Sequence, residues 1–403
     1  MFLVGHGADA TMRIVHLITR LIIGGAQENT ILSCEGLHAR GHEVHLLSGP
    51  TAGPEGSLVE RARGGPYRFE EIPDLVRQVN PWHDLRAMLA LQRRFVELRP
   101  AVVHTHSSKA GILGRVAAHR ARVPCIVHTI HGMSFNRTQP RAVRLVYAAA
   151  ERYCARRCHA LVSVADAMTE QALAAGIGRP EQYETIRSGM AVEDFDPADQ
   201  RCEKGFSHER EKTRAAWGVR EGEVVVGTVA RLFPNKGYEQ LLDVMDIAAR
   251  QEPRLRFVWV GDGAARRQYE AELSRRRLRE RTVLTGLLPP AEMPRVLAAI
   301  DILAHTSRWE GLPRAVVQAL LMEKPAVSFA IDGAPEIVRP GETGELAELD
   351  DIACFAGALV ALARDPARRA AFGRAGRARC LAEFDHRMMV ERLDALYRRL
   401  LHL

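Results

Sequence analysis

Two cations in the second half of the sequence could bind a diphosphate. Arg231 closes an apolar run and Lys236 opens a stretch of helical periodicity, five positions further on in ARLFPNKGYEQ. This spacing can direct two positive side chains and the amino end of a helix at one point. A diphosphate fits such an arrangement, although two solvated surface cations would show the same spacing.

The stretch WEGLPRAVVQAL, residues 309–320, adds a carboxylate and a second helix start. Glu310 precedes a Gly-Leu-Pro turn, and proline is favoured in the first turn of a helix. Backbone N–H groups at such a start have no helical partner and can meet an anion. Gln318 falls about one and a half turns into the expected helix, so a ligand that touches both ends must be long, as a sugar nucleotide is. The candidate contacts are Glu310, Gly311, Leu312, Pro313 and Gln318.

Two glycine pairs follow other apolar runs. Gly24 and Gly25 lie in LIIGGAQENT, and Gly261 and Gly263 lie in VGDGAARR. Glycines at the start of a helix can bring bare backbone N–H groups close to an anion, or they can simply shape a turn. The first pair lacks the GxGxxG spacing of a dinucleotide fingerprint, which lowers the case for NAD or FAD.

Three histidines also lie in or after strand-like runs. His131 stands directly after IVHTI, where it would lie at the end of a strand, so catalysis or substrate binding is favoured over a structural role. His104 and His106 share one face of VVHTH, and for them a structural role is at least as plausible.

Short β-branched runs alternate with longer amphipathic stretches twice along the chain, which predicts an α/β fold of two doubly wound parallel-sheet domains. In such sheets ligands bind beyond the carboxyl ends of the strands, where all these candidates lie. The charged segment 188–222 is the best linker candidate. The expected domains are 1–190 and 191–384, with 1–11 a disordered extension and a final helix, 385–403, that could pack back onto the first domain. The expected strands are 13–19, 43–48, 102–106, 126–130, 160–164, 224–230, 256–262, 282–286, 302–306 and 326–330.

Composition limits the class of protein. The chain has 403 residues, a formal net charge of +7 and 6% aromatic residues. The basic balance comes mostly from arginine and fits either phosphate-bearing partners or a solvated surface, while the low aromatic content argues against nucleic acid. Seven scattered cysteines argue for a reducing cytoplasm, and no apolar run reaches the length of a membrane span. The first eleven residues do not resemble a secretory signal, so Met12 is a candidate start.

Taken together, the motifs resemble a known family. GGAQ at 24–27, HG at 131–132, R-x4-K-G at 231–237, GDG at 261–263 and EGLP-x4-QA at 310–319 are similar to motifs of the retaining glycosyltransferases of family 4, in the same order. The resemblance covers nearly the whole chain from about Met12. It implies the GT-B architecture, in which two Rossmann-like domains face a central cleft.

The resemblance also implies roles for residues of the first domain and the cations. The Gly24-Gly25 loop would approach the donor diphosphate, and His131 would lie beside the donor sugar. Arg231 and Lys236 would neutralise the diphosphate as it leaves.

For the remaining motifs the implied contacts run along the donor. Glu310 stands at the first acid of the family's E-x7-E motif and would touch the sugar hydroxyls, with the backbone of Gly311 to Pro313 at phosphate. Gln318 stands at the second acid, which normally holds the ribose hydroxyls, so its amide puts the strength of that contact in doubt. Gly261 and Gly263 count among the donor-binding residues.

The function implied is transfer of a sugar, with retention, from a nucleotide-diphosphate sugar to a lipid-linked or polysaccharide acceptor. A UDP-sugar is the expected donor, and neither a metal nor another cofactor is expected. The alternatives are a nucleotide-sugar 2-epimerase of the same fold and a non-catalytic nucleotide-sugar-binding protein, the latter if Gln318 marks decay of the site.

An amphipathic stretch, 141–157, combines five arginines with apolar residues. It could dock on anionic lipid, which would make the protein cytoplasmic and peripheral on the inner face of the membrane. A buried amphipathic helix with a basic outer face is equally compatible with the pattern.

Overall fold

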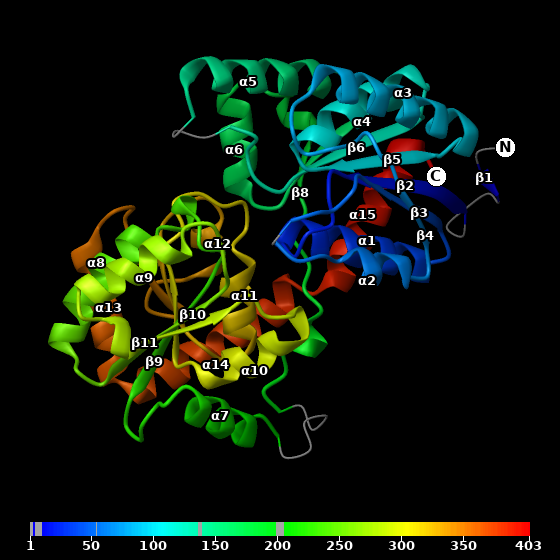
Figure 1. The fold of residues 1–403 in the computed structure, drawn as a ribbon. Coiled ribbons are helices and arrows are strands. Elements are labelled where there is room, and N and C mark those ends of the chain that lie inside the picture. Colours follow the sequence, from blue (N-terminus) through cyan, green and yellow to red (C-terminus); the bar gives the residue numbers. More distant parts are fainter. Residues whose placement is uncertain (1–2, 5–9, 54, 136–138, 199–204) are drawn as a thin grey trace. The chain divides into compact units, whose positions relative to one another are not determined.

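The computed structural model describes residues 3–4, 10–53, 55–135, 139–198 and 205–403. The chain divides into two compact units (Figure 1), the first made of Met1–Met190 and His386–Leu403 and the second of Ala191–Asp385. Each unit holds one sheet with helices on both faces. The predicted α/β fold with two doubly wound parallel sheets is confirmed.

The sheet of the first unit has the order β4-β3-β2-β5-β6-β7-β8, and all neighbouring pairs in this path are parallel. Its central strands are buried throughout, which explains why they are nearly continuous apolar runs in the sequence. The strands are β2 (Thr11–Ile18), β3 (Glu43–Ser48), β4 (Arg68–Glu71), β5 (Val102–His106), β6 (Cys125–Ile130), β7 (Ala160–Ser163) and β8 (Tyr183–Thr185).

Helices cover both faces of this sheet. In Figure 1, α3, α4 and α5 lie on one side and α1 and α15 on the other. The helices are α1 (Gly25–Ala39), α2 (Val59–Arg63), α3 (Pro81–Leu98), α4 (Ser108–Arg120), α5 (Arg141–Ala155), α6 (Asp166–Ala174), the 3-10 turn η1 (Pro180–Gln182) and α15 (His386–Leu401).

The sheet of the second unit has the order β11-β10-β9-β12-β13-β14, again parallel throughout. Helix α13 packs with α8 on one face, and α11 packs with α14 on the other. The strands are β9 (Val224–Val229), β10 (Leu255–Val260), β11 (Thr282–Gly286), β12 (Ile302–His305), β13 (Ala326–Phe329) and β14 (Gly344–Ala347). The helices and turns are η2 (Val192–Asp194), α7 (Gly205–Ala216), η3 (Pro234–Lys236), α8 (Tyr238–Gln251), α9 (Arg266–Arg275), η4 (Arg279–Arg281), η5 (Pro290–Glu292), α10 (Met293–Ala299), α11 (Arg314–Leu321), α12 (Ala334–Ile337), α13 (Ile352–Arg364) and α14 (Pro366–Glu383).

All ten strands expected from the sequence are present, with ends shifted by at most two residues. The strands that the sequence did not reveal include β4, β8 and β14, which form edges of their sheets. Each is short and partly exposed, because an edge strand is covered by a neighbour on one side only. Such strands lack the apolar run by which buried strands are recognised.

The expected linker, 188–222, is partly helical. Residues Gly205–Ala216 form α7, which packs against α10 in the second unit. Arg210 and Arg214 of this helix both form ion pairs with Asp301, at 2.6 Å and 2.9 Å. The charged residues of α7 therefore attach this helix to the second unit. Residues 199–204 of the expected linker lie outside the described part of the chain.

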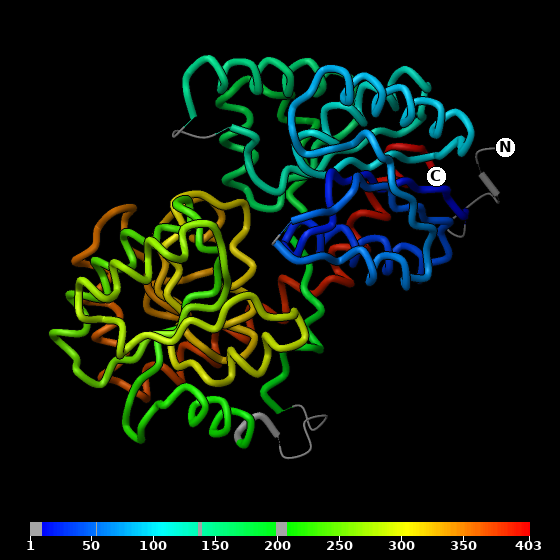
Figure 2. Tube along the Cα trace, viewed as in Figure 1, coloured from blue at the N-terminus to red at the C-terminus, as the bar shows by residue number. Residues whose placement is uncertain are grey.

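The N-terminal stretch differs in part from expectation, whereas the final helix packs on the first unit as expected. Residues Leu3–Val4 form β1, which pairs antiparallel with Thr11 and Met12 at the start of β2, so the stretch 1–11 is not wholly without structure. The rest of it, 1–2 and 5–9, lies outside the described residues. The final helix α15 packs on α1 of the first unit, and in Figure 2 the red C-terminal segment lies among the blue ones. Asp394 anchors it through an ion pair to Arg40 at 2.9 Å and a hydrogen bond to His42 at 3.1 Å.

Candidate active site

Most of the candidate residues follow the strands between which the strand order of each sheet reverses, whereas His131 follows β6 and Gly261 and Gly263 follow β10. In the first unit the reversal point lies between β2 and β5, and in the second between β9 and β12. Loops that leave neighbouring strands in opposite directions open a crevice at the carboxyl edge there, and doubly wound proteins bind ligands in it. Gly24 and Gly25 follow β2, Lys236 follows β9, and Glu310 follows β12.

Lys236 and Glu310 meet at the reversal point of the second unit. The Lys236 ammonium donates a hydrogen bond to Glu310 Oε1 and forms an ion pair with it, although the residues are 74 positions apart. Their side chains are 15% and 21% exposed. The predicted catalytic residues are His131, Arg231, Lys236 and Glu310, and the structure brings the last two together.

Three further residues surround Glu310 and were missed in the sequence. Ser307 Oγ donates to Glu310 Oε1 at 2.9 Å, and His305 Nε2 lies 3.6 Å from the same oxygen. Asp332 Oδ2 accepts the Glu310 backbone N–H at 2.6 Å. His305 ends β12, so the rule that singled out His131 could have found it. Asp332 lies in the loop just after β13, so the rule that selects residues after strand ends could have found it as well.

Glu310 is held as a carboxylate. Burial opposes its ionisation, but the neighbouring Lys236 ammonium, assisted by His305, outweighs that effect and lowers the pKa well below its usual value. Among the described residues, none hydrogen-bonds to Glu310 Oε2. That oxygen can therefore accept from a ligand hydroxyl.

Gly237 explains how Lys236 reaches this position. Its φ is +68°, and a Cβ at this residue would lie 1.8 Å from the Thr306 carbonyl oxygen. The two loops therefore pack backbone against backbone, which only glycine permits here. Thr306 Oγ1 also donates to the Lys236 carbonyl at 3.2 Å. Lys236 itself ends the 3-10 turn η3 and does not open α8, contrary to the expectation from the sequence.

Gly261 and Gly263 have a packing role. A Cβ on Gly261 would lie 2.1 Å from the Ala230 carbonyl oxygen, and one on Gly263 would lie 2.5 Å from that of Leu232. The loop after β10 can therefore press against the segment that carries Arg231. Contact of either glycine with the donor stays a prediction.

The second unit also contains Arg231, the turn at 311–313 and Gln318, which were predicted to contact the donor. The Arg231 guanidinium lies over the Phe233 ring, 5.1 Å from its centroid. Helix α11 begins at Arg314, so Pro313 precedes the helix and does not lie in its first turn as expected. Gln318, the fifth residue of α11, is half-buried, whereas Gly311, Leu312 and Pro313 are buried.

In the first unit, the predicted glycine loop forms a helix start. Gly25 is the first residue of α1, and the Gly24 carbonyl accepts the Glu28 N–H at 3.1 Å. The N–H groups of the first turn of a helix lack partners within the helix and carry its positive dipole end. Such a helix start can bind an anion, and contact of Gly24 and Gly25 with the donor stays a prediction.

His131 follows β6 and is half-buried at the carboxyl edge of the sheet. Its Nε2 lies 3.0 Å from Nδ1 of His106, whose Nε2 lies 2.9 Å from Nδ1 of His16. The next residue after β5, Ser107, has a φ of +62°, which is strained for a residue with a side chain. Its hydroxyl is hydrogen-bonded to Thr19 Oγ1 at 2.7 Å. His16, Thr19 and Ser107 were not singled out from the sequence.

Two family models match the chain. The model described as Glycosyl transferase 4-like domain matches residues 24–189, and the one described as Glycosyl transferases group 1 matches residues 209–379. Each half of the chain thus matches a glycosyltransferase model, and the protein is a glycosyltransferase. The prediction of a glycosyltransferase from the sequence is therefore confirmed.

Relatives that match this glycosyltransferase along most of its length are also named as glycosyltransferases. A UDP-Gal:alpha-D-GlcNAc-diphosphoundecaprenol alpha-1,3-galactosyltransferase of Escherichia coli is 29% identical over 360 residues, covering 88% of each chain. A D-inositol 3-phosphate glycosyltransferase of Mycobacterium marinum is 27% identical, covering 93% of this chain and 81% of its own.

Solved structures share the fold of this glycosyltransferase. Anabaena HepE in complex with UDP and glucose has a TM-score of 0.81 at 22% identity, covering 96% of this chain and 99% of its own. Sucrose-phosphate synthase of Thermosynechococcus elongatus has a TM-score of 0.80 at 19% identity, covering 97% and 99%. These likenesses confirm the predicted GT-B fold.

Proposed function

We propose that this enzyme belongs to family 4 and transfers a hexosyl group, with retention, from a UDP-sugar to a lipid-linked or cell-surface polysaccharide acceptor, without a bound metal. The Lys236–Glu310 pair at the reversal point of the second sheet carries the proposal, because it combines a cation for phosphate with a carboxylate for sugar hydroxyls. Support comes from the E. coli relative, which is named for UDP-Gal and a diphosphoundecaprenol acceptor, and from HepE, solved with UDP-glucose.

The proposed reaction separates charge at the phosphate. The bond between the anomeric carbon and the diphosphate oxygen breaks, and its electron pair leaves with UDP. The acceptor hydroxyl forms the new bond on the same face, and its proton passes to a phosphate oxygen. Preorganised cations and helix N–H groups stabilise this transition state more than the ground state. Lys236 and Arg231 supply the cations.

Glu310 has two roles in this proposal. In the free protein, Oε1 accepts from Lys236 and from Ser307, which orients the ammonium before the donor arrives. Oε2 accepts a hydroxyl of the donor sugar. His131 lies beside the sugar, as the family resemblance implies.

A panel of donors tests the function. UDP-galactose, UDP-glucose, UDP-N-acetylglucosamine and GDP-mannose are compared by thermal stabilisation and then by transfer to an undecaprenyl-diphosphate-linked N-acetylglucosamine. We expect a UDP-sugar to raise Tm and to release UDP only when acceptor is present, with an α-linked product and a rate unchanged by EDTA. Stabilisation by GDP-mannose alone contradicts the UDP assignment. Acceptor-independent release of UDP indicates an epimerase, and metal-restored activity after EDTA contradicts metal independence.

Gln318→Glu measures the ribose contact. A carboxylate accepts a charge-assisted hydrogen bond from ribose hydroxyls, whereas the native amide accepts a neutral one. The variant should therefore discriminate more strongly between UDP and 2′,3′-dideoxy-UDP, by about fivefold, corresponding to ~1 kcal/mol. Isothermal titration of both nucleotides measures the ratio, and Gln251→Glu at the far end of α8 serves as control. An unchanged ratio places Gln318 away from the ribose.

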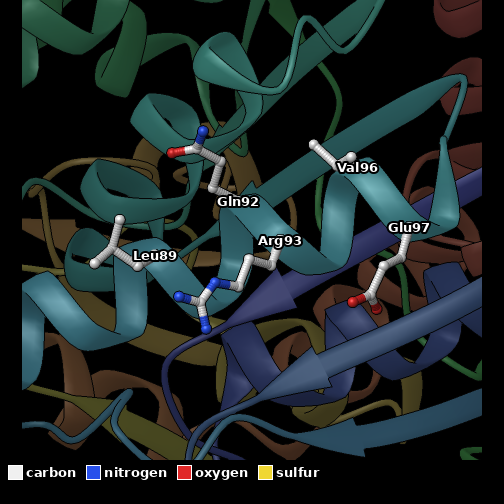
Figure 3. Close-up of a pocket in the computed structure, with 5 residues that line it drawn as sticks. All are labelled: Leu89, Gln92, Arg93, Val96 and Glu97. Carbon is white, nitrogen blue, oxygen red and sulfur yellow. The ribbon is translucent and has the colours of Figure 1, made fainter.

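Exposed apolar side chains point to a membrane contact through the first unit. In the described part of the chain, nine of the thirteen large exposed hydrophobic residues belong to α3, the residue two before it, or α5. Both helices lie on the same side of their sheet (Figure 1), and Figure 3 shows Leu89, Arg93 and Val96 on the outer face of α3, around a surface hollow of about 320 Å³. The nine are Val79, Trp82, Leu85, Leu89, Val96, Val143, Leu145, Val146 and Tyr153.

The charge of α5 favours anionic lipid. Its acidic residue, Glu151, is buried and ion-paired with Arg115 at 2.5 Å, whereas Arg141 and Arg152 are exposed. The outer face of α5 is thus both apolar and cationic. The second interpretation of the sequence, a buried helix whose outer face is only basic, does not describe it. We propose that α3 and α5 bind the enzyme peripherally to the inner face of the cytoplasmic membrane. In the described residues, no helix is both long and apolar enough to cross a bilayer.

Leu145→Glu/Val146→Glu tests this contact. The two side chains are 66% and 68% exposed, and placing carboxylates there opposes both apolar insertion and attraction to anionic lipid. Binding to phosphatidylglycerol vesicles at low salt should fall about a hundredfold in co-sedimentation, with little change in Tm. Leu381→Glu, at a 39% exposed site on α14, is the control. Equal binding of the native enzyme to neutral and anionic vesicles contradicts the proposal.

A further inference from the structure

Three histidines form a hydrogen-bonded chain that ends at the candidate site of the first unit. His16 lies on β2, His106 on β5, and His131 directly after β6. His16 Nδ1 lies 2.9 Å from His106 Nε2, and His106 Nδ1 lies 3.0 Å from His131 Nε2. His16 and His106 are fully buried, whereas His131 is half-buried.

Burial keeps the inner members of the chain neutral. It lowers the pKa of His16 to about 3, and burial together with the neighbouring histidines lowers the pKa of His106 well below its usual value. A neutral imidazole has one N–H and one lone pair. Each ring must therefore donate through one nitrogen and accept through the other, and the whole chain has only two arrangements of its protons.

The end of the chain at His16 decides between these arrangements. In the described structure, His16 Nε2 is buried and has no hydrogen-bond partner. If His131 donates to His106 and His106 donates to His16, then His16 Nε2 carries an unpaired N–H. If His16 donates to His106 and His106 donates to His131, then His16 Nε2 carries an unpaired lone pair. An orphaned buried N–H is the rarer and costlier defect. The protons therefore run from His16 towards His131, with Nδ1–H of each donating to Nε2 of the next.

We infer that His106 is a positioning residue that holds the imidazole of His131 as the tautomer protonated on Nδ1. His131 then accepts through Nε2 from His106 and donates through Nδ1. At neutral pH it acts as a hydrogen-bond donor and not as a general base. That the recipient is a hydroxyl or phosphate oxygen of the donor substrate rests on the proposed function, but the tautomer does not.

A metal ion is the competing explanation of the cluster. One nitrogen from each of His16, His104 and His106 lies within 4.8 Å of the others. Both nitrogens of His104, however, already face hydroxyls, those of Tyr397 at 2.5 Å and Thr129 at 2.7 Å. The rings of His104 and His106 are stacked, with centroids 4.4 Å apart and planes 27° apart. Lone pairs lie in the ring planes, so nearly parallel stacked rings do not point at one shared ion.

Long-range ¹H–¹⁵N spectra of the ¹⁵N-histidine-labelled enzyme at pH 7.5 test the inference without any substrate. The signals of His131 are assigned by their loss in His131→Gln. We expect the native enzyme to show His131 protonated on Nδ1, at least about tenfold over the other tautomer. His131 protonated on Nε2 overturns the inference, as does one zinc per chain that survives dialysis against EDTA.

His106→Phe removes the donor to His131 and nearly preserves its volume. His131 Nε2 then has no partner in the chain, so the His131 signals should shift towards a mixture of tautomers. In His16→Phe the unpaired end moves to His106 Nε2, which keeps its lone pair by the same rule, so the His131 tautomer should persist. His45→Phe, at another buried histidine of the same sheet, should also leave the signals unchanged. An unshifted His131 in His106→Phe overturns the role of His106, and if that variant does not fold, the native spectrum still decides the tautomer. A correct tautomer in a protein without transferase activity would refute only the proposed function.

Discussion

Lys236→Ala is expected to lower kcat for sugar transfer about a hundredfold or more while the protein still folds. Loss of one preorganised group that stabilises developing charge typically costs ~3 kcal/mol of barrier. Lys236 is such a group in the proposed reaction, because its ammonium is held at the reversal point of the second sheet. Steady-state kinetics with the best donor of the panel measures the loss, and Lys212→Ala, on the exposed face of α7, should leave kcat unchanged.

A second variant separates loss of chemistry from loss of structure. Lys236→Ala leaves the Glu310 carboxylate with Ser307 and the more distant His305, so we expect it to lose about 1–2 kcal/mol of unfolding free energy. In Lys236→Ala/Glu310→Ala the carboxylate that lost its cation is also removed. The free energy of unfolding should therefore return towards that of the native enzyme, whereas kcat should stay low. Recovery of activity together with stability would show that Lys236 acts only through the fold, and unchanged kcat in Lys236→Ala would remove it from the site.

Glu310→Gln should lower kcat/KM about ten- to a hundredfold. The substitution keeps the shape of the side chain but replaces charge-assisted hydrogen bonds to the donor sugar, worth ~1.5–3 kcal/mol, by neutral ones. Lys236 also loses the carboxylate that orients it. Glu342→Gln, at an exposed carboxylate of the same unit, is the control. Native kinetics in Glu310→Gln would exclude both roles proposed for Glu310.

The stability of the same variant depends on pH in a definite direction. The folded-state pKa of Glu310 lies below its usual value of 4.5, mainly because the Lys236 ammonium outweighs the effect of burial. The ionised form therefore stabilises the native enzyme above pH 4.5, and this contribution is lost as the pH falls from there towards the folded-state pKa. The difference in unfolding free energy between the native enzyme and Glu310→Gln, measured in urea, should be constant from pH 6 to 8 and shrink below pH 4.5. A difference independent of pH would contradict the charged pair.

Much of the fold could be predicted from local patterns. The ten expected strands belong to parallel sheets that are covered on both faces. Such strands have nearly continuous apolar sequences, which makes them recognisable. The edge strand β4, with the sequence RFEE, carries no such run, and neither does β8. The helix α7 inside the charged segment before β9 was also missed, because its arginines find their partner Asp301 far along the chain.

The site was predicted residue by residue but not as an assembly. Lys236 and Glu310 were each chosen because they follow a strand, and nothing in the sequence paired them. Their contact exists because β9 and β12 are neighbours in the sheet, and because Gly237 lets one loop touch the other. His305, at the end of β12, and Asp332, just after β13, obeyed the same rule and were overlooked.

By itself, the sequence determined the class of fold, the family and the chemical types at the strand ends, because these follow from short-range periodicity and short motifs. Only the tertiary structure decided which of those groups meet. It paired Lys236 with Glu310 across 74 residues and joined His16, His106 and His131 across three strands. Strand order sets such contacts, and strand order depends on long-range packing that no local segment encodes. It likewise showed that α5, which the sequence allowed to be buried, exposes Leu145 and Val146.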